Sequence, residues 1–250
     1  MPEDFLNNAI NDFHAWKEWN KTKFLDSFYN TDGNNLKRVL NIQNVLPSFK
    51  QLVYNNKALK HQDFLFQNAT SLYSSLFFEI VSAQEIHRDE PYFWTQPAHS
   101  YFGTWLALED TYDNNGPLIV IPGSHKLNPL MIDKIKIAHQ KYDDLKKINY
   151  LDEGLWNEYQ REIKKLCFGN GLQLKEVYVK KGDTIIWHSL LAHGGAKIKY
   201  ATRTRLSFVF HTTPHDTPVT QINTFFNPEA MVKMKAGYKY ESQNGRYINP

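Results

Sequence analysis

The sequence predicts a mainly β protein, folded as a sandwich or barrel, with a helical N-terminal third and a helical insertion. Short apolar runs rich in β-branched and aromatic residues follow one another from residue 76 onward, and turn-forming residues separate them. Two other stretches carry apolar residues at helical spacing. Aromatic residues make up 14% of the chain, a share that suits a β-rich core or an aromatic-lined pocket.

The N-terminal third has the pattern of amphipathic helices. Its first apolar residues lie three or four positions apart, as on one face of a helix. They are Leu6, Ile10, Phe13 and Trp16. Further along, Ser48 and Gln51 have the spacing of a capping box, in which the two side chains bind free backbone N–H groups at the start of a helix. This spacing predicts a second helix capped by Ser48.

Six short apolar runs are the expected strands. They span residues 76–81, 101–108, 118–121, 177–179, 184–187 and 206–210. The segment Asp113–Pro117 lies between two of the runs and combines Asp, Asn, Gly and Pro, which is a strong hairpin signal. Pro122-Gly123 and Lys181-Gly182-Asp183 mark two more turns. Short strands separated by turns are typical of sandwiches and barrels.

A helical insertion is expected at about residues 126–172, between two halves of the β core. Apolar residues there recur twice at helical spacing. The first group is Met131, Ile135, Ala138, Tyr142 and Leu145, and the second is Leu155, Tyr159, Ile163 and Leu166. Gly169-Asn170-Gly171 is expected to end the second helix. Because no repeat or linker interrupts the chain, residues 1–250 are predicted to form a single domain.

The composition excludes several classes of protein. With 42% apolar residues among 250, the chain can bury a core, which excludes wholesale disorder. A net charge of +3 gives no support to binding of nucleic acid or of a membrane surface. No run reaches the roughly 18 apolar residues of a membrane span. Cys167 is the single cysteine and the first residues lack a secretory signal, so we expect a reducing compartment, the cytoplasm.

One group of residues has the pattern of a metal site. His87 and Asp89 flank a single residue, and an extended backbone would place both side chains on the same face. A distant third ligand would complete a facial triad of two His and one carboxylate, which suits non-haem Fe(II) and oxygen chemistry. His193 is the best third ligand, because the glycines at 194 and 195 allow close backbone approach. With ten histidines in the chain, the His-x-Asp triplet alone is a weak signal.

Several longer motifs surround these residues in a fixed order. Trp-x-Ala-Leu-x-Asp occupies residues 105–110, and Asn-Gly-x-Leu-x-x-x-Pro-Gly-Ser-His occupies residues 115–125. Lys181-Gly182-Asp183 then precedes His193, and Arg205 follows it. In this set the chain resembles the phytanoyl-CoA dioxygenase family of Fe(II)/2-oxoglutarate oxygenases. The resemblance covers residues 78–126 and 177–214, and both long motifs are far more specific than the metal triplet.

The resemblance implies a fold, a metal and a reaction. The fold would be a double-stranded β-helix, also called a cupin-like jelly roll, with helices packed on one side. His87, Asp89 and His193 match the Fe(II) ligands. The reaction would couple oxidative decarboxylation of 2-oxoglutarate by O2 to hydroxylation of an unactivated C–H bond in a small metabolite or biosynthetic intermediate. Related halogenases have a small residue in place of the carboxylate, so Asp89 favours hydroxylation, or a desaturation or ring-forming variant.

The resemblance also assigns residues to the cosubstrate. Arg205 matches the arginine that binds the distal carboxylate of 2-oxoglutarate, Trp105 matches an aromatic residue that lines it, and Gln84 lies where it can reach the same pocket. Arg203 and Arg205 follow His193 by 10 and 12 positions, whereas the common family spacing falls between. They would share one face of an extended strand, so Arg203 stays open as an alternative. Gly195 stands where the family usually has Ser.

Several neighbouring residues have two interpretations each. Tyr92, Phe93 and Trp94 follow Asp89 closely and would either contact a substrate or only pack. His188, His211 and His215 either line the pocket or have a structural role. Ser124 in the Pro-Gly-Ser-His motif is expected to stabilise the turn by hydrogen bonding.

Two other functions stay open at this point. A jelly roll can also serve as a non-catalytic protein that binds a metal or small ligand, and Gly195 in place of Ser slightly favours that alternative. A nucleic-acid demethylase is disfavoured, because the chain has no basic stripe. We therefore expect a small-molecule substrate, with neither nucleic acid nor membrane as partner. The patterns leave the substrate and the oligomeric state open.

Overall fold

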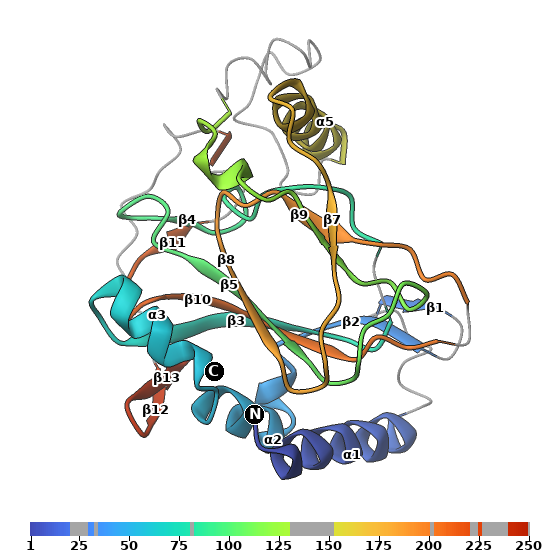
Figure 1. Cartoon of the computed structure of the whole chain (residues 1–250). Coiled ribbons are helices and arrows are strands. Elements are labelled where there is room, and N and C mark those ends of the chain that lie inside the picture. Colours follow the sequence, from blue (N-terminus) through green and yellow to red (C-terminus); the bar gives the residue numbers. More distant parts are fainter. Residues whose placement is uncertain are drawn as a thin grey trace.

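The computed structural model describes residues 1–20, 30–32, 35–80, 83–130, 153–200, 203–220, 225–226 and 240–249 (Figure 1). A large sheet and a small sheet enclose the site between them. The large sheet has the strand order β1-β2-β3-β10-β5-β8, and the hairpin β12-β13 joins it through a parallel pairing of β13 with β3. Its strands are β1 (Asn30–Asp32), β2 (Asn35–Leu40), β3 (Thr70–Phe78), β5 (Phe102–Ala107), β8 (Thr184–His188), β10 (Ser207–Pro214), β12 (Glu241–Gln243) and β13 (Arg246–Ile248).

The small sheet has three antiparallel strands in the order β7-β6-β9. They are β6 (Leu118–Val120), β7 (Lys175–Val177) and β9 (His193–Gly195). A separate two-stranded ribbon pairs β4 (Trp94–Thr95) with β11 (Val219–Thr220). Leu118 of the small sheet packs in one cluster with Trp105 and Val209 of the large sheet, so the two sheets face each other. They form the jelly roll that the sequence predicted.

The two faces of the large sheet have different partners, because side chains alternate along each strand. Phe77, Phe208 and Phe210 point to one face and pack against the N-terminal helices (Figure 1). The ring of Phe77 lies 4.4 Å from that of Phe13, measured between centroids. Residues one position away, such as Phe78, point to the opposite face and line the space between the sheets. One face therefore provides the main core, and the other provides the site.

The helices agree with the predicted pattern in most respects. They are α1 (Glu3–Trp19), α2 (Pro47–Tyr54), α3 (Ala58–Phe66) and α5 (Glu153–Gly169), with short 3-10 turns at Ile42–Asn44 and Ser124–Lys126. The predicted cap of α2 is wrong: its N-cap is Leu46, no side chain caps it, and Ser48 lies inside the first turn. Pro47 takes the first helical position, where its missing N–H costs nothing. None of the described helices combines the length and apolar character of a membrane span.

The N-terminal third contains strands that were not predicted, and only part of the predicted insertion lies within the described residues. β2 lies in the N-terminal third, where only helices were expected, and its Val39 and Leu40 pair with β3. In the insertion, α5 confirms the second predicted helix and buries Leu155, Tyr159 and Ile163 against the small sheet side of the fold. The first predicted helix of the insertion, from Met131 to Leu145, lies outside the described residues.

Candidate active site

The ends of two distant segments meet at a short backbone pairing. The N–H groups of His87 and His193 each donate to the carbonyl of the other, at 2.9 Å. Gly195 extends the pairing by donating its N–H to the Gln84 carbonyl at 3.0 Å. A Cβ atom on Gly194 would lie 2.6 Å from that carbonyl oxygen, so the close approach requires glycine there. Gln84 takes part in this pairing, although residues 83–86 form no regular strand.

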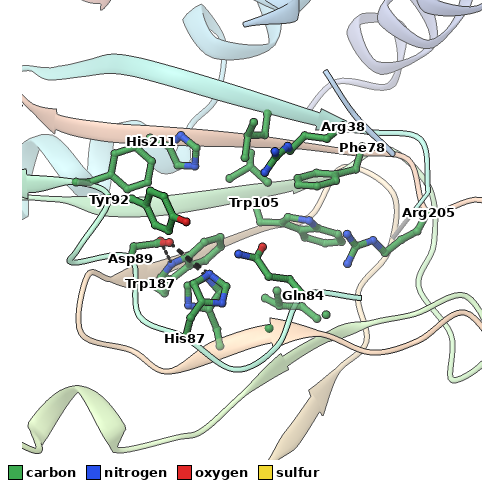
Figure 2. Close-up of a pocket in the computed structure, with 17 residues that line it drawn as sticks. Arg38, Phe78, Gln84, His87, Asp89, Tyr92, Trp105, Trp187, Arg205 and His211 are labelled. Carbon is green, nitrogen blue, oxygen red and sulfur yellow. Dashed lines mark hydrogen bonds and ion pairs between the residues drawn. The ribbon is translucent and has the colours of Figure 1, made fainter. Parts of the chain in front are cut away.

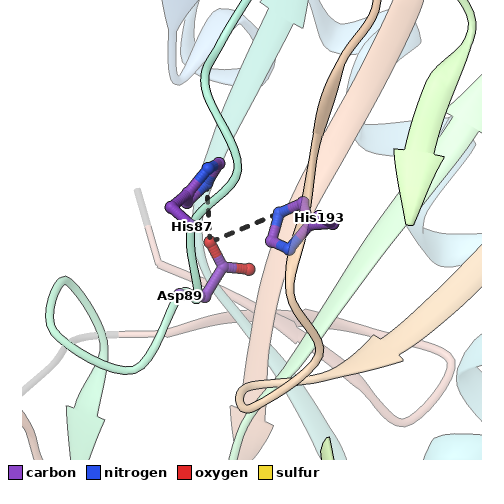
Figure 3. A group of neighbouring side chains, drawn as sticks. All are labelled: His87, Asp89 and His193. Carbon is purple, nitrogen blue, oxygen red and sulfur yellow. Dashed lines mark ion pairs between the residues drawn. The ribbon is translucent and has the colours of Figure 1, made fainter. Parts of the chain in front are cut away.

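This pairing brings the three predicted ligands together (Figure 3). The Nε2 atoms of His87 and His193 each lie 3.7 Å from Oδ1 of Asp89. One donor atom from each residue lies within 4.8 Å of the other two, and all three side chains are buried. Two imidazole nitrogens and one carboxylate oxygen so placed match the facial triad of non-haem iron sites.

Backbone carbonyls orient both histidines. The Nδ1 atom of His87 lies 2.7 Å from the Glu85 carbonyl, and the Nδ1 atom of His193 lies 3.0 Å from the Leu191 carbonyl. A carbonyl only accepts, so each Nδ1 carries the proton and each Nε2 keeps its lone pair for a metal. Burial and the neighbouring His193 lower the pKa of His87 to about 4, which keeps it in the neutral form that binds metals.

Two aromatic side chains hold the carboxylate. Asp89 accepts a hydrogen bond on Oδ2 from the Tyr101 hydroxyl at 2.9 Å and another from the Trp187 indole N–H at 2.8 Å. Both bonds fall on Oδ2, which leaves Oδ1 directed at the histidines. Burial alone would raise the pKa of Asp89, but His193, His87, His211 and the Trp187 bond outweigh it and lower that pKa.

The Trp187 ring packs directly against the backbone of a glycine, Gly103. Trp187 lies opposite Gly103 in the pairing of β5 with β8. A Cβ atom at position 103 would come within 2.1 Å of the indole ring, so only glycine leaves room for the ring beneath Asp89.

We expect Trp187→Phe to weaken metal binding about 10- to 100-fold, the usual effect of removing a hydrogen bond from a metal ligand. Phenylalanine keeps most of the packing and removes the N–H donor to Asp89. Calorimetric titration with Mn(II) measures the effect. Trp19→Phe, at a position that is 86% exposed on α1, is the matched control and should bind as the unmodified protein does. Equal affinity in the two variants would contradict the role assigned to Trp187.

The side chain of Ser124 in the Pro-Gly-Ser-His motif, which was expected to stabilise its own turn, holds the segment before His193. Ser124 accepts the N–H of Ala192 on its hydroxyl oxygen at 2.8 Å. Arg88, which is fully buried, donates in turn to the Ser124 carbonyl at 2.7 Å. Arg88, which lies between His87 and Asp89, thus links the segment that carries these two ligands to the turn that follows β6.

A cavity of about 310 Å³ extends from the three ligands between the sheets (Figure 2). Arg205, Trp105 and Gln84 all line it, as the sequence predicted. Tyr92, Phe93 and His211 also line it, whereas Trp94, His188 and His215 do not. Arg203 does not line the cavity either, and its side chain is exposed.

Arg205 is a buried cation in an aromatic frame. Its guanidinium carbon lies 5.4 Å from the ring of Trp105 and 5.9 Å from that of Phe78. It donates to the Gly116 carbonyl at 3.2 Å, while its Nε and the indole N–H of Trp105 are buried donors with no acceptor among the described residues. Burial lowers the pKa of Arg205 to about 10, and Glu109 acts against this shift. The group stays positively charged at neutral pH.

Sequence reasoning missed three contributors. Tyr101 and Trp187 had been assigned only to strands, because nothing local marks them as partners of Asp89. Arg38 was missed because its segment was expected to be helical, whereas it lies on β2 and lines the cavity.

Solved structures of other proteins have the same overall fold. The epimerase SnoN, solved in complex with Fe3+, alpha ketoglutarate and nogalamycin RO, superimposes with a TM-score of 0.62 over 99% of this chain and 90% of its own, at 13% identity. EctD from S. alaskensis, solved with 2-oxoglutarate and 5-hydroxyectoine, gives 0.57 over 87% and 70%, at 16% identity. At these identities the likeness shows a shared fold.

The sequence comparisons identify the family. Peroxisomal phytanoyl-CoA dioxygenase of Bos taurus is 30% identical over 119 residues, which are 48% of this chain but only 30% of that protein. The family model described as phytanoyl-CoA dioxygenase (PhyH) matches residues 8–201, more than three quarters of the chain. This protein belongs to the phytanoyl-CoA dioxygenase family.

Proposed function

We propose that the protein is an Fe(II)- and 2-oxoglutarate-dependent dioxygenase that hydroxylates an unactivated C–H bond of a small molecule. The observation that carries the proposal is the His87–Asp89–His193 triad at one wall of a cavity that also contains the buried Arg205. The name of the family supports a dioxygenase, and the Fe3+ and alpha ketoglutarate bound by SnoN and the 2-oxoglutarate bound by EctD support the metal and the cosubstrate.

The donor set fits Fe(II). Both imidazoles present an unprotonated Nε2, because Nδ1 of each is occupied by a carbonyl. The carboxylate presents Oδ1, because Oδ2 accepts both hydrogen bonds. No thiolate takes part: the single cysteine, Cys167, is buried in the cluster around α5. Three ligands on one side leave positions free for other groups, which suits oxygen chemistry at iron.

The second half of the cavity fits 2-oxoglutarate. Arg205 offers a planar set of donors that matches a carboxylate in two hydrogen bonds. Its Nε and the Trp105 indole N–H are buried donors without acceptors among the described residues, as a site for an anionic ligand requires. Gln84 faces the same space (Figure 2). We assign Arg205 to the distal carboxylate, and Trp105 and Gln84 to its surroundings.

In this reaction iron supplies the activation of oxygen, and 2-oxoglutarate supplies two of the four electrons that reduce it. The chain holds the participants in place. Tyr101 and Trp187 keep the carboxylate of Asp89 in position, and Arg205 orients the cosubstrate. Aromatic side chains around the cavity, including Phe93 and Tyr92, exclude water from the space beside the metal.

The alternative of a non-catalytic jelly-roll binder is less well supported. Gly195, which suggested it, donates its N–H to the Gln84 carbonyl and belongs to the pairing that joins the two ligand segments. Its position is therefore explained by backbone geometry. The oriented triad together with a buried, uncompensated arginine favours the catalytic function.

The proposed function can be tested by asking whether the protein turns over 2-oxoglutarate and needs Fe(II) to do so. Purified protein supplied with Fe(II), 2-oxoglutarate and O2 is expected to release succinate, even without the proper substrate, since such enzymes consume some 2-oxoglutarate in uncoupled turnover. Succinate release measured by chromatography should disappear when Fe(II) is removed by a chelator and return when Fe(II) is added back. Anaerobic calorimetry should show 2-oxoglutarate binding only with metal present. The absence of both succinate release and metal-dependent 2-oxoglutarate binding would overturn the proposal.

A further inference from the structure

Arg38 is a second arginine at the cavity, and the sheet register determines where it points. In the pairing of β2 with β3, Val39 lies opposite Phe77, and both are buried on the helix-covered face. Arg38, one position earlier, therefore projects to the other face, next to Phe78. Figure 2 shows its guanidinium group directed into the cavity, which Arg38 lines. Its side chain is also exposed, so it stands at the mouth of the cavity.

Arg38 has no ionic partner in the described part of the chain. Two other arginines do have ionic partners: Arg246 pairs with Asp63 at 2.6 Å, and Arg161 pairs with Glu158 at 2.5 Å. No carboxylate of the described residues lies within ion-pair distance of Arg38. Tyr92 and His211 line the cavity with it, and its positive charge reaches both.

The charges within the cavity leave Arg38 uncompensated. With Fe(II) bound at Asp89 and 2-oxoglutarate held by Arg205, the formal charges of these four groups sum to zero. Apart from the histidines, the ionisable Asp, Glu, Lys and Arg side chains among the described residues that line the cavity are Asp89, Arg205 and Arg38. A cation at the edge of a water-poor space is best stabilised by an anion, because Coulomb interactions there are less screened than in bulk water.

We propose that Arg38 recognises an anionic group, a carboxylate or a phosphate, on the substrate. This inference rests on the proposed function, since it assumes that Arg205 and the triad are taken by 2-oxoglutarate and iron. The anionic group lies at the mouth, where it stays partly hydrated. The carbon skeleton then extends into the cavity, which Leu76 and Phe93 also line, and presents its C–H bond to the triad.

The test compares anionic ligands with uncharged counterparts that have the same carbon skeleton. The probes are phenylacetate with phenylacetamide, octanoate with octanamide, and phenyl phosphate with phenol. Binding is measured by anaerobic calorimetry on the full chain loaded with Mn(II) and 2-oxoglutarate. The unmodified protein should bind at least one anion about 10-fold more tightly than its neutral counterpart. A preference within the carboxylate pairs or within the phosphate pair identifies which anion the substrate carries.

Three variants assign the preference to Arg38. Arg38→Gln should remove the preference and leave the affinity for the neutral probe unchanged, and Arg38→Lys should keep part of it. Arg161→Gln, an exposed arginine of α5, should keep all of it. Equal binding of anionic and neutral probes by the unmodified protein overturns the inference, as does weaker 2-oxoglutarate binding in Arg38→Gln, which would place Arg38 in the cosubstrate site. Failure of the unmodified protein to bind 2-oxoglutarate with metal overturns the proposed function instead, and this inference with it.

Discussion

His193→Ala is expected to lower the affinity for Fe(II) or Mn(II) by more than about 100-fold, beyond the usual effect of removing a hydrogen bond to a ligand. The imidazole is one of three donors, and within the 4.8 Å cluster of donor atoms no other His, Cys, Asp or Glu of the described residues takes part. Two donors alone hold the metal weakly. Succinate release from 2-oxoglutarate should fall to the background in the same variant.

The backbone should tolerate the change. The two hydrogen bonds between His87 and residue 193 use only main-chain atoms, so alanine keeps them. The variant does lose the contact of the imidazole with the Trp187 ring, whose centroid lies 4.7 Å away, and we expect a modest loss of stability. Circular dichroism will show whether the fold is retained.

A thermal measurement separates loss of metal from loss of structure. A metal that binds the folded state alone stabilises it by about 2.7 kcal/mol at 100 times its dissociation constant. Unmodified protein should therefore melt at a higher temperature with Mn(II), and His193→Ala should not. His61→Ala, at an exposed position on α3, is the matched control and should keep the full shift. A metal-induced shift in His193→Ala as large as in the control would refute the assignment.

The ligands could be predicted because a His-x-Asp triplet and a distant His lie within an ordered set of family motifs. His87 and Asp89 are separated by one residue, and His193 stands beside the glycines that its backbone pairing needs. The residues that hold the ligands could not. Trp187 reaches Asp89 only because β8 pairs with β5 in a register that places Gly103 opposite it. Such a register arises between segments more than 80 positions apart and leaves no local pattern.

Local structure also explains the unresolved choice between two arginines. Alternation along an extended strand would have placed Arg203 and Arg205 on the same face. In the structure β10 begins only at Ser207, so the alternation rule does not apply to the residues before it. The Arg205 N–H bonds to the Glu79 carbonyl, beyond the end of β3, and the Arg205 side chain lines the cavity. Short strands and turns predicted a sandwich or barrel, and the family resemblance implied the jelly roll, whereas β2 lies in a stretch where only helices were expected. That residues 1–250 form a single domain stays a prediction.

Arg205→Met is expected to raise the KM for 2-oxoglutarate by about 100-fold, the size of effect that follows the loss of a buried, hydrogen-bonded charge partner. Arg205 is 4% exposed, so a carboxylate held there is desolvated and depends on the guanidinium. Methionine fills much of the same volume and leaves no charge behind. Metal affinity without cosubstrate should stay unchanged, because Arg205 does not contact the triad.

Two further variants make the assignment specific. Arg205→Lys keeps the charge but replaces the planar set of donors by a single ammonium group, so we expect an intermediate loss. Arg203→Gln should leave the KM for 2-oxoglutarate unchanged, because that side chain is exposed outside the cavity. Steady-state succinate release at varied 2-oxoglutarate gives all the KM values. A large rise in KM for Arg203→Gln, with little change for Arg205→Met, would reverse the assignment. It would also remove the charge balance from which the role of Arg38 is inferred. The role of Arg205 therefore has to be tested before that of Arg38.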